Sequence, residues 1–155
     1  TLADSSLIPC SFPWMFNLIR ALEAVGLYER ADGIIWSVYR DMLKDHLTTV
    51  PERPFLVRSD CHAWSALVLY ELPRKWLGVH PGQPGWTEIR ITPVPCGLSQ
   101  CAGQVCTPKG SVEVSWLIKD GRYSLSFTAP SVPVRVYLPD GRGFYFPDGG
   151  SHIVE

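Results

Sequence analysis

The spacing of apolar residues between Ser11 and Val79 is helical. In the first part of this stretch, apolar side chains recur at steps of three and four residues, which is the period of one helix face. They are Phe12, Met15, Phe16, Ile19, Leu22 and Leu27. Pro13 suits the first turn of such a helix and Gly26 suits its end. The pattern therefore predicts a first helix that stops at Gly26.

Two further helices are predicted in the same half of the chain. One covers residues 31–44 and turns one apolar face toward its neighbours. That face consists of Ile34, Ile35, Val38, Met42 and Leu43. The other runs from about residue 61 to residue 77, with Ser59 or Asp60 as its N-cap, and Pro73 should end or kink it. Its interior is almost entirely apolar, which is typical of a helix buried on most sides.

After Gly78 the pattern changes to alternation with period two, which indicates strands with one buried face. The alternating stretches are 88–91, 111–116, 123–127 and 134–138, with glycine-containing turns between them. Residues 82–155 are therefore predicted to form a small antiparallel β-sandwich of about six strands. With an antiparallel layer of helices in residues 1–79, the chain is predicted to be of the α+β class with two domains.

The composition is globular and electrically balanced. Hydrophobic residues make up 46% of the 155 residues and charged residues 19%, with a net charge of −1. Because both signs are interspersed, the charge pattern gives no basis for binding nucleic acid or an anionic membrane surface. The longest apolar runs are also too short to span a bilayer.

The five cysteines do not form a recognisable metal-binding motif. Cys96, Cys101 and Cys106 repeat with four residues between neighbours, whereas zinc sites usually show paired CxxC spacing with a nearby histidine. We expect thiols that behave as small apolar residues in strands. No metal site is predicted. Because the number of cysteines is odd, at least one of them is unpaired or pairs outside the chain, and the sequence does not indicate which two would form a disulfide.

Neither half of the chain is large enough to cover its own apolar surface well. We therefore expect exposed apolar side chains that pack against something beyond these residues. The chain also begins at Thr1, without an initiator methionine, in what resembles the tail of another segment. These features predict a piece of a longer protein.

The segment from Leu47 to Ala66, LTTVPERPFLVRSDCHAWSA, carries the candidate chemistry. Glu52 lies between Pro51 and Pro54, which stiffen the loop on both sides of the carboxylate. His62 and Trp64 follow ten and twelve residues later. A carboxylate for proton transfer, an imidazole for hydroxyl groups and an indole for a ring face would together suit a sugar. The alternative is an ordinary proline loop followed by a helix with a buried tryptophan.

Several motifs carry a resemblance to a known family. They are the threonine pair and glutamate of LTTVPE, then RSDCHAWSA, then LGVHPGQPGWTEIRITP, and finally VCTPKGSVEVSW. In this order and spacing they resemble the C-terminal end of bacterial-type α-L-rhamnosidases, glycoside hydrolase family 78, from about residue 11 to the end. The resemblance implies that residues 1–79 are the last helices of an (α/α)6 catalytic barrel. Residues 82–155 would be the C-terminal β-sandwich domain.

The resemblance also implies an activity and roles for individual residues. The family hydrolyses terminal α-L-rhamnosides with inversion, using two carboxylic acids. Glu52 matches the family's general base, while the general acid lies upstream, in a segment absent from this sequence. His62 would bind sugar hydroxyls and Trp64 would line the ring face, with a core role for Trp64 as the alternative. The implied partners are rhamnose-containing glycosides and the missing N-terminal part of the protein, and no cofactor or metal is needed.

The sequence departs from the family pattern in three places. Val50 and Pro51 stand where an aromatic residue commonly precedes the base, His46 replaces a glycine, and Tyr39 replaces a tryptophan. Two alternatives to rhamnoside hydrolysis therefore stay open. The chain could be a non-catalytic carbohydrate-binding or structural module, or part of an (α/α)6 glycosidase for another sugar. A binding sandwich would need exposed aromatics, for which the candidates are Tyr137, Phe144, Tyr145 and Phe146, and alternation places at least half of these in the core.

Overall fold

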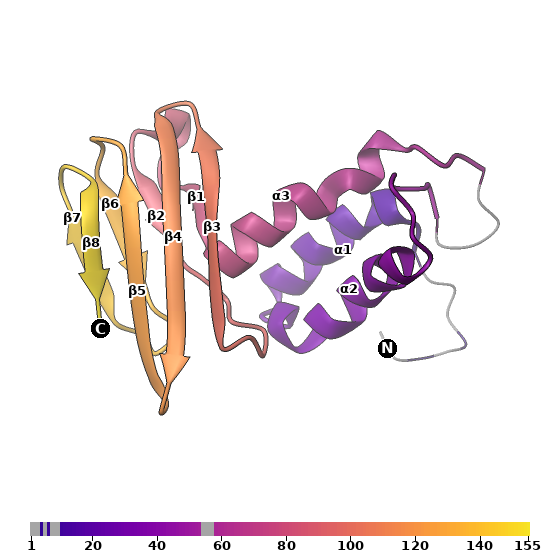
Figure 1. The fold of residues 1–155 in the computed structure, drawn as a ribbon, viewed down its shortest axis with the longest axis horizontal. Helices are drawn as coiled ribbons and strands as arrows, with labels where there is room; N and C mark the ends of the chain where they lie inside the picture. Colours follow the sequence, from indigo (N-terminus) through magenta and orange to yellow (C-terminus); the bar gives the residue numbers. More distant parts are fainter. Residues whose placement is uncertain (1–3, 5, 7–9, 54–57) are drawn as a thin grey trace. The chain divides into compact units, whose positions relative to one another are not determined.

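A computed structural model describes residues 4, 6, 10–53 and 58–155, and it divides the chain into two compact units (Figure 1). Residues 1–70 form the first, called here the helical unit, and residues 71–155 form the second, the sandwich unit. The chain has the predicted α+β composition, with helices first and strands after them. No helix among the described residues is both long and apolar enough to cross a lipid bilayer.

Helix α1 (Phe12–Ala24) agrees with the sequence pattern. Pro13 lies in its first turn, and Gly26 follows its end with a φ of 67°, in the left-handed region that glycine adopts without strain. The predicted apolar stripe is largely correct, since four of its members are buried. These are Phe12, Met15, Ile19 and Leu22, whereas Phe16 and Leu27 are exposed.

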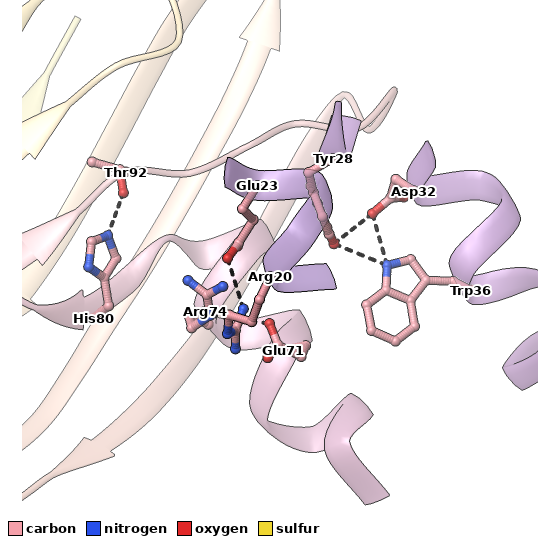
Figure 2. A network of polar contacts seen from close by, with 9 residues as sticks. All are labelled: Arg20, Glu23, Tyr28, Asp32, Trp36, Glu71, Arg74, His80 and Thr92. Carbon is pink, nitrogen blue, oxygen red and sulfur yellow. Dashed lines mark hydrogen bonds and ion pairs between the residues drawn. The ribbon is translucent and has the colours of Figure 1, made fainter. Parts of the chain in front are cut away.

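Helix α2 (Tyr28–Lys44) begins three residues earlier than predicted, and its buried face overlaps the predicted one only in part, at Ile35 and Met42. Ile34 and Leu43, which were expected inside, are 46% and 72% exposed. The buried residues are Tyr28, Ala31, Asp32, Ile35, Trp36, Tyr39 and Met42. The reason is a polar network inside the apolar stripe, because Tyr28 Oη and Trp36 Nε1 both donate to Asp32 Oδ1, at 2.9 and 2.8 Å (Figure 2). These bonds let a carboxylate face inward beside two aromatic rings.

The third helical segment contains three conformations in sequence. A 3₁₀ helix η1 (Ala63–Leu67) leads into α3 (Val68–Leu72), and a π-helical turn η2 (Pro73–Leu77) follows. Pro73 therefore changes the helix type without ending the helix. The prediction of a helix buried on most sides is wrong. Leu69 and Tyr70 are 77% and 58% exposed, while Ser65 and Glu71 are fully buried.

The sandwich unit contains eight strands in two four-stranded sheets. The strands are β1 (Val79–Pro81), β2 (Ile89–Ile91), β3 (Gln100–Thr107), β4 (Gly110–Lys119), β5 (Arg122–Ala129), β6 (Val134–Tyr137), β7 (Gly143–Phe146) and β8 (Gly150–Val154). A short 3₁₀ helix η3 (Pro84–Trp86) joins β1 to β2. The strand order is β1-β2-β6-β7 in one sheet and β3-β4-β5-β8 in the other.

Alternating apolar residues of both sheets supply the core of the sandwich unit, as the period-two pattern predicts. Val112, Val114 and Trp116 of β4 are buried together with Leu125 and Phe127 of β5. The expectation of a purely antiparallel sandwich is wrong in one place, because β2 and β6 pair in parallel. Such a pair needs a long connection, and here the whole β3-β4-β5 meander forms that connection between the sheets.

Cys101 and Cys106 lie in β3, as expected for thiols in strands, whereas Cys96 lies in the turn that precedes it. All five cysteines belong to the described part of the chain, and none of them is in a disulfide there.

Gly78 should be the residue at which this fold tolerates a side chain least. Its φ is 76°, and a Cβ atom would lie 2.2 Å from the backbone nitrogen of Pro93. We expect Gly78→Ala to lower the free energy of unfolding by about 4 kcal/mol or more, because backbone atoms cannot move aside cheaply. The control is Gly97→Ala, with a φ of 80° and no described atom within 4 Å of the added Cβ. It should cost only about 1–2 kcal/mol of left-handed strain. Urea unfolding of the two variants measures this, and equal losses would contradict it.

His80 should make the stability of the chain depend on pH. Its Nε2 lies 2.6 Å from Thr92 Oγ1 (Figure 2), and burial, followed by the charges of Arg74, Arg90 and Lys75, lowers its pKa to about 4. Between pH 6.5 and pH 4 the unfolded chain therefore binds a proton that the folded chain refuses, so stability falls as the pH falls through this window. The loss should reach up to about 3 kcal/mol.

The test for His80 is urea unfolding at pH 7 and at pH 4.5, compared between the wild type and His80→Gln. The variant lacks the titrating imidazole, so it should lose less stability on acidification. Equal pH sensitivity of the two proteins would show that His80 is not the responsible group.

Candidate functional site

Three hydrogen bonds fold the loop after α2 back on itself. Thr49 Oγ1 donates to the carbonyl of Asp60 at 2.6 Å, the backbone N–H of His62 donates to the carbonyl of Val50 at 2.8 Å, and the N–H of Glu52 donates to the carbonyl of Ser59 at 2.9 Å. Residues 49–52 therefore lie alongside residues 59–62. This pairing, called here the loop clasp, brings Glu52 and His62 onto one short piece of structure. Pro54, the second predicted stiffening residue, lies outside the described residues.

The carboxylate of Glu52 is held by both arms of one arginine. Arg58 Nε donates to Oε2 at 2.9 Å, and Arg58 Nη2 donates to Oε1. The side chain of Arg58 is 75% exposed, whereas that of Glu52 is only 12% exposed. The hydrogen bond from Arg58 lowers the pKa of Glu52, and the charges of Arg58, Arg53 and His62 act in the same direction. Glu52 is therefore an ionised carboxylate at neutral pH.

The pairing of Arg58 with Glu52 is bidentate, a geometry that is among the strongest ion-pair arrangements. No periodicity relates two loop residues six apart, so this contact could not be found from spacing.

His62 and Trp64 lie at the start of η1, and their rings meet edge to face. The ring centroids are 6.3 Å apart and the planes are inclined by 84°. Trp64 is 77% exposed, so it is not part of the core that the described residues form. His62 occupies the N-cap position in place of Ser59 or Asp60, and no side chain of the described residues caps this helix. The exposed indole has a free face on the same loop that holds the carboxylate.

Tyr39 of α2 fixes the helix that carries Trp64. Its hydroxyl donates to the carbonyl of Ser65 at 2.9 Å, and its ring lies 4.8 Å from that of Phe12 and 5.5 Å from that of Trp36. Burial raises the pKa of Tyr39, so the hydroxyl stays protonated and donates. Sequence reasoning noted Tyr39 only as a departure from a family pattern and missed this contact.

The aromatic candidates on the sandwich unit divide as alternation predicts. Phe144 and Phe146 pack against the core, whereas Tyr137 and Tyr145 are 43% and 52% exposed. Arginines cover both tyrosines, since the guanidinium of Arg135 lies 4.6 Å from the Tyr145 ring centre and that of Arg90 lies 5.9 Å from the Tyr137 ring centre. Because these rings already carry a cation, they offer a weaker platform for a sugar than the indole of Trp64.

The loop clasp therefore combines an ionised carboxylate, an imidazole and an exposed indole. Glu52 can accept a proton from a water molecule, since a carboxylate has about four lone-pair positions and Arg58 uses two of them. Within the described residues, no three His, Cys, Asp or Glu side chains gather into a group that would hold a metal ion.

Residues 78–150 match the family model described as the bacterial α-L-rhamnosidase C-terminal domain. This match covers most of the sandwich unit. A search of curated proteins finds no significant match.

Several solved α-L-rhamnosidase structures are similar to this chain. The family 78 rhamnosidase of Bacillus sp. GL1 is 34% identical over 90% of the chain, with a TM-score of 0.79. The enzymes of Dictyoglumus thermophilum and Aspergillus terreus are 19% and 21% identical over 92% and 88% of the chain, with TM-scores of 0.79 and 0.75. The chain spans only 16–20% of the length of these three structures.

The similarities to the Dictyoglumus thermophilum and Aspergillus terreus enzymes, both below 25% identity, show the fold alone. The family model and the more similar Bacillus structure add agreement in sequence, on the sandwich unit and on the chain as a whole. Residues 78–150 thus belong to the family of bacterial α-L-rhamnosidase C-terminal domains, and the chain as a whole is similar to solved α-L-rhamnosidases, which supports a C-terminal rhamnosidase fragment.

Proposed function

We propose that this chain is the C-terminal part of an inverting α-L-rhamnosidase and supplies the general-base side of its active site. The observation that carries the proposal is the loop clasp, which holds an ionised Glu52 on the same loop as His62 and an exposed Trp64. The substrates would be terminal α-L-rhamnosides.

In this mechanism Glu52 takes a proton from a water molecule that attacks the anomeric carbon. A second carboxylic acid protonates the leaving oxygen on the opposite face of the ring. An inverting enzyme keeps two such carboxyls about 6.5–9.5 Å apart, so that the water fits between the base and the sugar. The groups whose charges act on Glu52 are Arg58, Arg53 and His62, all basic. As the family resemblance implies, the general acid would come from another segment of the enzyme.

His62 and Trp64 would bind the rhamnose unit beside the base. The imidazole would exchange hydrogen bonds with ring hydroxyls, because a neutral histidine offers one donor and one acceptor. The indole would cover the apolar face of the sugar, including the methyl group that rhamnose carries in place of a hydroxymethyl. The 77% exposure of Trp64 supports this role, since the ring lacks cover among the described residues.

The helices of residues 1–79 would be the last helices of an (α/α)6 barrel, and residues 82–155 would be the sandwich that follows it. The large exposed apolar side chains of the helical unit support this part of the proposal. Trp14, Leu43 and Leu69 are 65%, 72% and 77% exposed. Neighbouring helices of the same barrel would cover such side chains.

Glu52→Gln tests the role of the base in a complete enzyme that contains this chain. The amide keeps the shape of the side chain but cannot accept a proton, so kcat should fall by about 10²–10⁴-fold while substrate affinity changes little. Initial rates with an aryl α-L-rhamnoside measure this. Asp60→Asn, which alters a neighbouring carboxylate of the same loop, should retain normal turnover. Near-normal kcat for Glu52→Gln would remove Glu52 from the base role.

Trp64→Ala tests the sugar platform. The substitution should raise KM roughly tenfold, which corresponds to about 1.4 kcal/mol of lost binding. Leu69→Ala is the control for the loss of a large apolar side chain, since Leu69 lies five residues further along the helical segment and has no proposed contact with the sugar. Its KM should stay that of the wild type. A KM for Trp64→Ala within twofold of the wild type would contradict the assignment.

A further inference from the structure

Arg58 is the residue that contacts both carboxylate oxygens of Glu52. Its guanidinium forms two hydrogen bonds to the carboxylate of Glu52, yet most of the side chain is exposed to solvent. An exposed arginine usually contributes little to stability through a surface ion pair. A bidentate pair on a candidate catalytic group therefore calls for a different explanation.

The loop clasp explains why Arg58 and Glu52 meet. The N–H of Glu52 donates to the carbonyl of Ser59, the residue directly after Arg58. The bonds of Val50 to His62 and of Thr49 to Asp60 hold the same two stretches side by side. The backbone thus presents residue 58 next to residue 52 before the side chains contribute. The ion pair is built into the loop and does not result from a chance meeting of two long side chains.

We propose that Arg58 is the positioning residue of the Glu52 carboxylate, fixing its orientation and holding it in the ionised form required of a base. This inference rests on the proposed function. The planar guanidinium fork matches both carboxylate oxygens at once, which fixes the rotation of the carboxylate as well as its location. The remaining lone pairs of the two oxygens stay available to a water molecule. Arg58 itself touches neither the water nor the sugar in this arrangement.

The effect of Arg58 on the pKa of Glu52 can be distinguished from the effects of the other basic groups around this carboxylate. Three groups act on this carboxylate, namely Arg58, Arg53 and His62, and each lowers its pKa. Only Arg58 adds hydrogen bonds to its charge, and those bonds are the largest cause of the lowered pKa. Removal of Arg58 should therefore raise the pKa of Glu52 and protonate the base at a higher pH. Removal of Arg53 should have a smaller effect in the same direction.

The experiment compares wild type, Arg58→Gln, Arg58→Lys and Arg53→Gln in the complete enzyme, with kcat and KM for an aryl α-L-rhamnoside measured from pH 3 to pH 8. We expect the acidic limb of the kcat profile of Arg58→Gln to move to higher pH, because the hydrogen bonds that lower the pKa of Glu52 are lost. Its kcat at the optimum should fall by roughly 10–10²-fold, with KM within threefold of the wild type. Arg58→Lys, which keeps the charge and loses the fork, should move the limb less and still lower kcat.

An unmoved acidic limb in Arg58→Gln would overturn the inference, as would a KM that rises more than kcat falls, because the arginine would then bind substrate directly. If Arg58→Gln fails to fold, the pKa of Glu52 can be measured by ¹³C NMR of its carboxyl carbon in wild type and Arg58→Lys of this 155-residue chain; equal pKa values there would also overturn it. Full activity of Glu52→Gln would remove the proposed function itself. An inactive Glu52→Gln with a wild-type profile for Arg58→Gln would overturn this inference alone.

Discussion

The pairing of residues 49–52 with residues 59–62 is the constraint on which the candidate site depends. Without it, Glu52 and His62 would be two loop residues ten positions apart with no fixed relation. Three short hydrogen bonds set that relation, and one of them comes from the side chain of Thr49. Thr49, the second threonine of the LTTVPE motif, therefore has a physical role. Its hydroxyl donates to the loop carbonyl of Asp60, which no regular secondary structure would satisfy.

The two units of the chain are stabilised in different ways. In the sandwich unit, buried residues of both sheets form one cluster, and Trp116 Nε1 donates to the carbonyl of Trp76 at 2.7 Å. The helical unit buries part of its apolar surface and leaves several large side chains exposed. Its inner packing relies on polar anchors within aromatic surroundings, such as Asp32 and the hydroxyl of Tyr39. Loss of one such anchor would leave a buried polar group unpaired.

Local patterns allowed the sequence to predict some elements and not others. Pro13 and Gly26 bracket α1 because their conformational preferences act locally, and alternation located the core of β4 and β5 for the same reason. The face of α2 was misjudged because its stripe includes Asp32, whose burial depends on donors four positions away on either side. The Arg58–Glu52 pair and the Tyr39–Ser65 bond escaped prediction because both depend on the path of a loop. Glu52, His62 and Trp64 were singled out by residue type, the family resemblance suggested their roles, and the structure supplied their exposure and contacts.

A low pKa has opposing consequences for a general base. Proton transfer is most efficient when the pKa of the base lies near the working pH, so the bond from Arg58 makes Glu52 a weaker base. The same pairing favours the ionised carboxylate and, in the proposed role, fixes its orientation through both of its oxygens. In an inverting mechanism the water attacks a centre that already carries positive charge in an oxocarbenium-like transition state, so little base strength is required. Orientation and ionisation then matter more than proton affinity, and a bidentate arginine supplies both.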